Sequence, residues 1–223
     1  MRNADFALAK SFYEKANAFK GIPRLSYDWD DASKKSVTKP IAYAVGEYNG
    51  FNNISSLIFG HNVWESFGSK PEESMKAENT SVFSFIKPKM NKIELADVLL
   101  QLQKIGAGKD EKAIKANQLI GNLLYNTSVL GYYREVFVMD VDNSNGPKFQ
   151  FWNVDNPPFH YYYKNYSSKS FVDADNFDLA INYYQKALNL SKDREQKARI
   201  LFQMASAEQG KYYQWEMKND EPV

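Results

Sequence analysis

The sequence predicts an all-α protein in which helical hairpins form an α-α superhelix, with long aromatic-rich insertions between them. Three segments carry apolar residues at the spacing of amphipathic helices, namely residues 4–20, 92–126 and 176–213. These segments also match one another, and a hairpin that cannot cover its own apolar face needs neighbours of the same kind. We therefore expect one domain over residues 1–223, with insertions at about 22–91 and 129–174.

The first predicted helix covers residues 4–20 and has one continuous apolar face. Gly21 and Pro23 end it, because glycine often terminates helices and proline cannot continue them. The residues expected on the buried face are Phe6, Ala9, Phe12, Tyr13, Ala16 and Phe19.

The first insertion differs in composition from the helices on either side of it. Prolines recur from Pro23 to Pro88, and glycine and asparagine cluster at residues 46–53. Apolar runs are short, so we expect only short helices here, at residues 41–48 and 54–67. The apolar residues of the second are Leu57, Ile58, Val63, Trp64 and Phe67.

Residues 92–105 and 111–125 form the middle predicted hairpin. Gly106 and Gly108 end its first helix, and Asp110 caps its second. Gly121 lies inside the apolar stripe of the second helix, where glycine costs about 1 kcal/mol relative to alanine. We expect this glycine to allow the close approach of a neighbouring helix.

The second insertion contains two β-rich runs, at residues 136–141 and 149–154, around an Asn-Gly turn. This pattern predicts a small β-hairpin. The final helical hairpin follows at residues 176–213, and we interpret Ala180, Tyr184 and Ala187 as its packing residues.

The first and last helical segments share an internal repeat. Leu8-Ala9-x-x-Phe12-Tyr13-x-Lys15-Ala16 matches Leu179-Ala180-x-x-Tyr183-Tyr184-x-Lys186-Ala187 at five identical positions and one Phe/Tyr exchange. The middle hairpin joins them, since residues 109–119 match residues 192–201 with a one-residue gap. The repeat therefore extends over both helices of a hairpin.

The pattern Ala180-x-x-x-Tyr184-x-x-Ala187 resembles the second helix of a tetratricopeptide repeat, as does Ala9-x-x-x-Tyr13-x-x-Ala16. Ile120-Gly121 with Leu124 resembles the core of that family's first helix. The sequence departs from the family at Asp175, where glycine is usual, and in its insertions, which replace a period of about 34 residues. The resemblance implies a helical-repeat scaffold.

The run Asn122-Leu-Leu-Tyr-Asn-Thr-Ser128, followed by an aromatic-rich insertion and another hairpin, is similar to the ends of large repeat proteins of Bacteroidetes-type bacteria. This resemblance implies that the chain is part of a larger protein, with a periplasmic or cell-envelope location as one alternative. The chain has no cysteine, and cysteine-free chains suit both reducing and oxidising compartments.

Charge and hydropathy exclude two classes of partner. The 28 Lys+Arg and 27 Asp+Glu leave a net charge of +1, so a nucleic-acid partner is not expected. No window approaches the run of about 18 apolar residues that a membrane span requires, so direct membrane insertion is not expected.

Catalytic and metal-binding patterns are missing from the sequence. His61 and His160 lack a second ligand at helical spacing, and the run from Asp140 to Gly146 lacks both the sixth-position glycine and the twelfth-position glutamate of a calcium loop. No phosphate-binding glycine pattern or nucleophile elbow occurs. We therefore expect no enzyme activity, no cofactor and no metal.

Two binding functions remain open. In the first, the concave helix face binds a protein or peptide partner within a larger assembly. In the second, the module binds carbohydrate on a scaffold resembling outer-membrane glycan-binding proteins with tetratricopeptide cores, and its tryptophans stack on sugar rings. Aromatic residues of the insertions serve either as this binding surface or as packing. The candidate binding residues are Trp29, Trp64, Trp152, Tyr161, Tyr162 and Tyr163.

Overall fold

The computed structural model describes residues 1–18, 24–41, 54–61, 80–128, 131, 133–137 and 176–219. This part of the chain is mostly helical, with five α-helices and two small antiparallel sheets. The helices predicted from apolar periodicity are therefore confirmed, in a mostly helical fold that also contains small antiparallel sheets.

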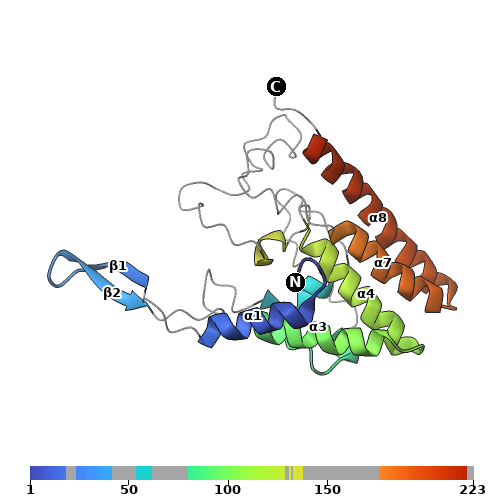
Figure 1. Cartoon of the computed structure of the whole chain (residues 1–223), viewed down its shortest axis with the longest axis horizontal. Coiled ribbons are helices and arrows are strands. Elements are labelled where there is room, and N and C mark those ends of the chain that lie inside the picture. The colour runs from blue at the N-terminus through green and yellow to red at the C-terminus, as the bar shows by residue number, and fades with distance from the viewer. Residues whose placement is uncertain are drawn as a thin grey trace.

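The five helices lie side by side in the order in which they occur in the chain (Figure 1). α1 (Phe6–Ala18) packs on α3 (Lys92–Gly106), and α3 packs on α4 (Glu111–Asn126). α4 then packs on α7 (Asn176–Leu190), and α7 packs on α8 (Arg194–Asn219). Because α4 contacts α3, α7, α8 and a short 3-10 helix, it is the centre of the helical body.

Two of the helices begin at the caps that their sequences supply. Asn91 accepts a hydrogen bond from the Glu94 amide at 2.8 Å, and the Glu94 carboxylate accepts one from the Asn91 amide at 2.9 Å. This reciprocal capping box starts α3. Asp110 starts α4 as predicted, because its Oδ1 accepts from the Ala113 amide at 2.9 Å.

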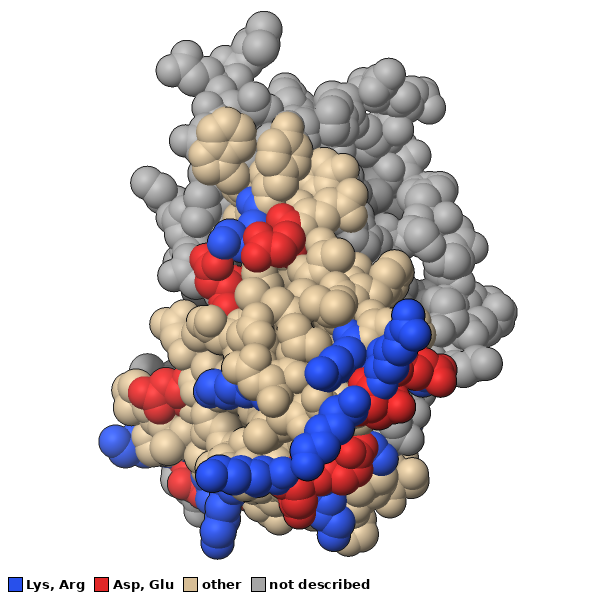
Figure 2. Space-filling model, turned by 90° about the vertical axis from the view of Figure 1, so that its right-hand side faces the viewer, with Lys and Arg blue, Asp and Glu red and all other residues tan. Residues whose placement is uncertain are grey.

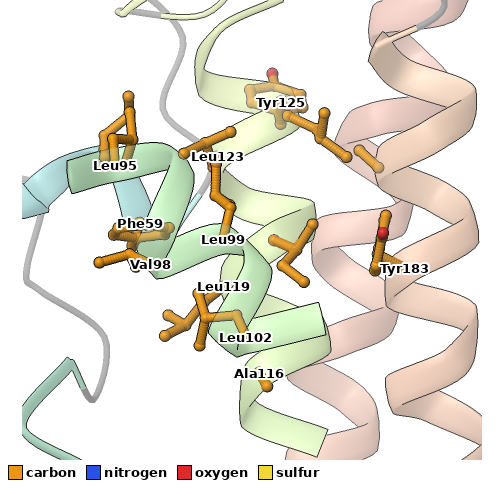
Figure 3. Packing of buried hydrophobic residues seen from close by; sticks show 14 of the residues in the cluster. Phe59, Leu95, Val98, Leu99, Leu102, Ala116, Leu119, Leu123, Tyr125 and Tyr183 are labelled. Atoms are coloured by element: carbon orange, nitrogen blue, oxygen red, sulfur yellow. The ribbon is translucent and has the colours of Figure 1, made fainter. Parts of the chain in front are cut away.

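The main core lies between α3, α4 and α7 (Figure 3). Leucines of α3 and α4 face each other there, and Phe59 covers one end of the cluster. On the other side of α4, the rings of Tyr125 and Phe177 meet edge to face with centroids 5.6 Å apart. The buried leucines are Leu95, Leu99, Leu102, Leu119, Leu123 and Leu124.

Gly121 has the packing role that the sequence predicts. A Cβ at this position would lie 2.5 Å from Cε1 of Tyr184, so only glycine accommodates the tyrosine ring at this distance. Tyr184 is fully buried, as are Ala180 and Ala187 on the same face of α7. The interpretation of these three residues as packing residues is confirmed.

Figure 1 shows a two-stranded hairpin that extends away from the helices. Its strands, β1 (Arg24–Asp30) and β2 (Lys35–Ile41), pair antiparallel with Trp29 opposite Ser36. Lys34 has φ 52° in the connecting turn, which lets a short loop reverse the chain. The sequence prediction missed this hairpin.

Residues 54–61 do not form the helix expected at their position. The segment has a two-residue strand, β3 (Ile54–Ser55), which pairs with β4 (Lys89–Met90), and then the 3-10 helix η2 (Ser56–Phe59). Asparagine side chains of α4 hydrogen-bond the η2 carbonyls, which favours a tight turn over a continuous helix. The second half of this expected helix, and residues 42–48 of the other, lie outside the described residues.

Two further 3-10 helices complete the described elements. η3 (Thr80–Val82) precedes β4, and η4 (Arg134–Phe137) follows α4. The β-strand predicted at residues 136–141 is therefore wrong at its first two residues, which belong to η4. The remaining residues of the predicted β-hairpin lie outside the described residues.

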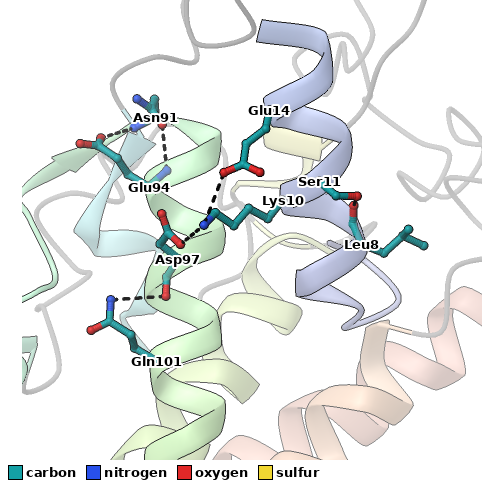
Figure 4. A network of polar contacts seen from close by, with 8 residues as sticks. All are labelled: Leu8, Lys10, Ser11, Glu14, Asn91, Glu94, Asp97 and Gln101. Carbon is teal, nitrogen blue, oxygen red and sulfur yellow. Dashed lines mark hydrogen bonds and ion pairs between the residues drawn. The ribbon is translucent and has the colours of Figure 1, made fainter. Parts of the chain in front are cut away.

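α1 is attached to α3 by an ion pair as well as by packing (Figure 4). Lys10 Nζ lies 2.7 Å from Asp97 Oδ1 and 3.4 Å from Glu14 Oε1. The hydrogen bond to Asp97 is the main reason why the pKa of Lys10 is raised. Phe6 is buried in this contact, but Phe12 is 58% exposed, so its predicted place in the core is wrong. Phe12 lies near Leu8, which is also exposed, on the side of α1 away from α3.

None of the helices in the described ranges combines the length and the low charge needed to cross a lipid bilayer.

Candidate functional site

α8 carries apolar residues on two faces, and its inner face packs against the other described helices. The inner face contacts α7 and α4, and its residues are buried. A Cβ at Gly210 would lie 2.4 Å from the Phe177 ring, which shows how closely α8 approaches α7. Each residue of an α-helix is rotated by about 100° around the helix axis from the one before it, so the buried positions of α8 fall within an arc of about 80° around that axis. They are Ile200, Gln203, Ala207, Gly210 and Gln214.

The outer face of α8 carries exposed apolar residues. Phe202 is 72% exposed, Leu201 is 51% exposed, and Ala198 and Ala205 are exposed beside them. Further along the helix, the rings of Tyr212 and Trp215 stack with centroids 6.3 Å apart. We call these six residues the outer stripe of α8. The mean angular position of the six residues around the helix axis is about half a turn from that of the inner face. The stripe therefore points away from α7.

Figure 2 shows the side of the molecule on which α8 lies, with an area of uncharged residues between charged side chains. Charged side chains lie mostly around this area rather than within it. Large apolar residues clustered on a surface and surrounded by charged residues are typical of an interaction site. By contrast, a single exposed leucine would need no explanation.

One ion pair attaches α8 to α7, and another lies within α8 itself. Lys211 Nζ lies 2.6 Å from Asp178 Oδ1 of α7, and this hydrogen bond is the main cause of the raised pKa of Lys211. Near the start of α8, Arg199 pairs with Glu195 at 2.6 Å. Arg194 and Lys197 are exposed, and neither forms an ion pair within the described part of the chain.

Of the candidate binding residues predicted from the sequence, the structure describes only Trp29. It lies on β1 and is 59% exposed, so it is not packed against the helices. The other five, Trp64, Trp152, Tyr161, Tyr162 and Tyr163, lie outside the described residues. The structure therefore does not bring the predicted set together in one site.

The acidic residues beside Trp29 are used within the hairpin itself. Asp28 Oδ1 accepts from the Trp29 amide at 3.1 Å. Asp30 accepts from the Ser33 hydroxyl and from the amides of Ala32 and Ser33. The Ser33 hydroxyl contributes most to lowering the pKa of Asp30. These carboxylates therefore stabilise the turn rather than form a ligand site around the tryptophan.

A second polar cluster lies deep between α4, α7, α8 and η2. Asn122 Oδ1 accepts from the Tyr184 hydroxyl at 2.9 Å and from Gln203 Nε2 at 2.7 Å, while its Nδ2 donates to the Phe59 carbonyl at 2.9 Å. Asn126 Nδ2 donates to the carbonyls of Ile58 and Gly60, both at 3.0 Å. Because the donors and acceptors of Asn122 are used internally, we interpret the cluster as structural.

Metal-binding geometry is not found in the described ranges, where no group of three or more His, Cys, Asp and Glu residues is close enough to hold an ion. His61, which follows η2, is half-buried. The calcium-like run near Asp140 and His160 lie outside the described residues.

The sequence analysis did not find the outer stripe, because it named packing residues only for the first helix of the final hairpin and none for α8. A signal was nevertheless present in the helix. Residues 200, 203, 207, 210 and 214 form one face, and the apolar residues left over gather on the opposite side. A helix that is apolar on two opposite faces needs a partner on each of them.

Comparison with known proteins does not assign the chain to a family. No family model matches the chain, and neither a curated protein nor a solved structure is significantly similar to it.

Proposed function

We propose that this protein is a non-catalytic interaction module, a scaffold that binds a protein partner within a larger assembly through the outer stripe of α8. The observation that carries this proposal is the exposed apolar face, centred on Leu201 and Phe202. Complete burial of a leucine or phenylalanine side chain contributes about 1.5–3 kcal/mol. Burial of the stripe by a partner would therefore contribute favourably to the free energy of binding.

The arrangement of the helices supports a scaffold role. Each helix packs on the next one in the chain, in a row that begins at α1 and ends at α8. We propose that this row is of the tetratricopeptide type, based on the repeated Ala and Tyr positions of α1 and α7. In such a row the last helix presents a face like those buried between its predecessors.

The proposal places the partner on α8 rather than on the hairpin at β1 and β2. The carbohydrate alternative requires several tryptophans that stack on sugar rings. Of the tryptophans predicted for this role, only Trp29 on β1 lies within the described residues. A protein surface with Leu, Phe, Tyr and Trp grouped on one helix fits the composition of interface hot spots better.

Purification from the native source under mild conditions tests this function. We expect a tagged wild-type chain to co-purify with a stoichiometric protein partner. Phe202→Ser removes the most exposed ring of the stripe, so the partner should be lost from that variant.

Phe12→Ser is the matched control, because Phe12 is 58% exposed on α1 at the other end of the row. It should keep the partner. A chain that elutes alone as a monomer, or a partner that stays bound equally well to both variants, would contradict the proposed function.

A further inference from the structure

The centre of the outer stripe has a self-complementary sequence. Ala198-x-x-Leu201-Phe202-x-x-Ala205 reads with the same spacing of small and large residues in both directions. The two large residues are 51% and 72% exposed, and the alanines on each side of them are exposed as well. Such a pattern fits a copy of itself when that copy runs in the opposite direction.

We propose that the outer stripe binds the same stripe of a second copy of this chain, with the two α8 helices antiparallel about a two-fold axis between Leu201 and Phe202. This inference rests on the proposed function and names the partner of that surface. In this register Leu201 and Phe202 of one copy meet the same two residues of the second copy at the centre of the contact. Ala198 lies opposite Ala205 of the second copy, and these small residues let the helices approach closely.

Charge supports this orientation. Lys197 and Glu208 are eleven residues apart, or about three turns, so they lie on the same side of α8. When the two copies are related by the proposed axis, Glu208 of one copy and Lys197 of the other are separated by about 3 Å along the helix axis. Arg194 lies at least as close along the helix axis to Glu208 of the other copy. At each of two symmetric places in the interface, Arg194 and Lys197 of one copy therefore lie near Glu208 of the other.

The competing like-charge contact is weak in this arrangement. Glu195 is level with Glu208 of the second copy, but it lies on the other flank of the stripe and already pairs with Arg199 at 2.6 Å. In a parallel arrangement Lys197 of one copy and Glu208 of the other would be separated by about 16 Å along the helix, so this contact could not form. The contact between Lys197 and Glu208 is therefore specific to the antiparallel pair.

The size of the stripe sets the expected strength of the dimer. In this register Tyr212 and Trp215 are level with residues 191 and 188 of the second copy, before its α8 begins, so Leu201 and Phe202 are the large residues that become buried. Aromatic side chains bury about 150–250 Å² each, so the contact would bury on the order of 200 Å² per copy, well below the total of about 1,200–2,000 Å² in stable complexes. We therefore expect a weak, concentration-dependent dimer with a dissociation constant of about 100 μM to 1 mM.

Cysteine cross-linking tests the register directly, because the chain contains no cysteine that could interfere. Ala198→Cys and Ala205→Cys are prepared separately, then oxidised mildly either alone or as a mixture. We expect a disulfide-linked dimer mainly in the mixture, since each cysteine would then lie opposite the other. In either variant alone, the two cysteines would be separated by about 10 Å along the helix. Efficient cross-linking of each variant with itself would show a parallel pair and overturn the proposal.

Sedimentation of the cysteine-free chain measures the equilibrium itself. Phe202→Ser should raise the dimer dissociation constant by about tenfold to a hundredfold. Phe12→Ser should leave it unchanged, and circular dichroism should show the same helix content for both variants. If Phe202→Ser sediments with the wild-type dimer constant, the stripe is not the dimer interface and the proposal is wrong.

Charge exchange provides a second measure. Lys197→Glu and Glu208→Lys should each weaken the dimer, because each variant places like charges next to each other across the axis. The double variant should restore it, with the largest effects at low salt. An equal effect in the single and double variants would contradict the charge pairing.

The outcomes also separate this inference from the proposed function. A chain that stays monomeric up to about 1 mM overturns the self-association. If that monomer still co-purifies with a different protein that Phe202→Ser releases, the proposed function stands. If it neither dimerises nor binds such a protein, both proposals are wrong.

Discussion

Gly121 sets the distance at which α7 lies on α4. We expect Gly121→Ala to lower the free energy of unfolding by about 1–3 kcal/mol, because the new methyl group would lie 2.5 Å from the Tyr184 ring. This loss should exceed the gain of about 1 kcal/mol that alanine brings to a helix interior. Urea unfolding monitored by circular dichroism measures the difference.

A second variant distinguishes crowding from other effects at this residue. Tyr184→Leu removes the ring that a methyl group at residue 121 would meet. Adding Gly121→Ala to a chain that already carries Tyr184→Leu should therefore cost much less than it does in the wild type. Equal losses in the two backgrounds would show that the close approach does not limit this position.

α4 is the element whose polar side chains organise the others. Asn122 is fully buried and connects η2, α7 and α8 through three hydrogen bonds. We expect Asn122→Leu to destabilise the fold by about 2–4 kcal/mol, because Tyr184, Gln203 and the Phe59 carbonyl each lose a buried hydrogen bond. Chemical denaturation checks this value.

The control for this variant is Asn182→Leu, since Asn182 is exposed on α7. It should change the unfolding free energy by less than about 0.5 kcal/mol. Combining Asn122→Leu with Tyr184→Phe removes one of the unsatisfied donors and should recover part of the loss. A small effect of Asn122→Leu alone would mean that the buried network contributes little to stability.

The helices were predictable from the sequence because their apolar residues recur at helical spacing and their caps are explicit, as at Asp110. The hairpin at residues 24–41 was not predicted, although Leu25, Tyr27 and Trp29 alternate as in a strand. Pro23 and Pro40 suggested a loop, and the turn lacks the Asn-Gly pair that usually marks a hairpin. η2 depends on Asn122 and Asn126, which are distant in the sequence, so local patterns do not reveal it.

At the scale of the whole molecule, buried tyrosines make stability depend on pH in the alkaline range. Burial raises the pKa of Tyr13 from 10.0 to about 12, and it raises the pKa of Tyr125 further. At pH values between about 10 and 12, these tyrosines keep their protons in the folded protein, whereas they ionise in the unfolded chain. These groups therefore favour the folded state equally at all pH values below about 9, and this contribution is lost as the pH rises through 10 toward 12.

Tyr125→Phe provides the measurement. The Tyr125 hydroxyl is buried and has no hydrogen-bond partner within the described ranges, so the variant should be nearly as stable as the wild type at pH 7. Its loss of stability between pH 9 and 11 should be smaller, and adding Tyr13→Phe should reduce the loss again. Urea midpoints that fall by the same amount in all three proteins would show that these tyrosines do not cause the alkaline sensitivity.

The candidate site was less predictable than the fold, and the reason lies in the whole molecule. Whether Leu201 and Phe202 are core or surface depends on which other helices lie beside α8, and a single helical pattern does not contain this information. The aromatic residues chosen from the sequence came from the insertions, because aromatic density there was high. The structure describes only Trp29 among them.

The hydrogen bonds between η2 and α4 also determine the order in which the chain can fold during synthesis. The carbonyls of Ile58 and Phe59 accept hydrogen bonds from Asn126 and Asn122, and these asparagines are synthesised more than 60 residues later. The pair α3 and α4 can form by local contacts, whereas η2 must close a long loop to reach it. η2 therefore reaches its final packing only after α4 has been made, and until then a chaperone has apolar residues such as Ile58 and Phe59 to bind.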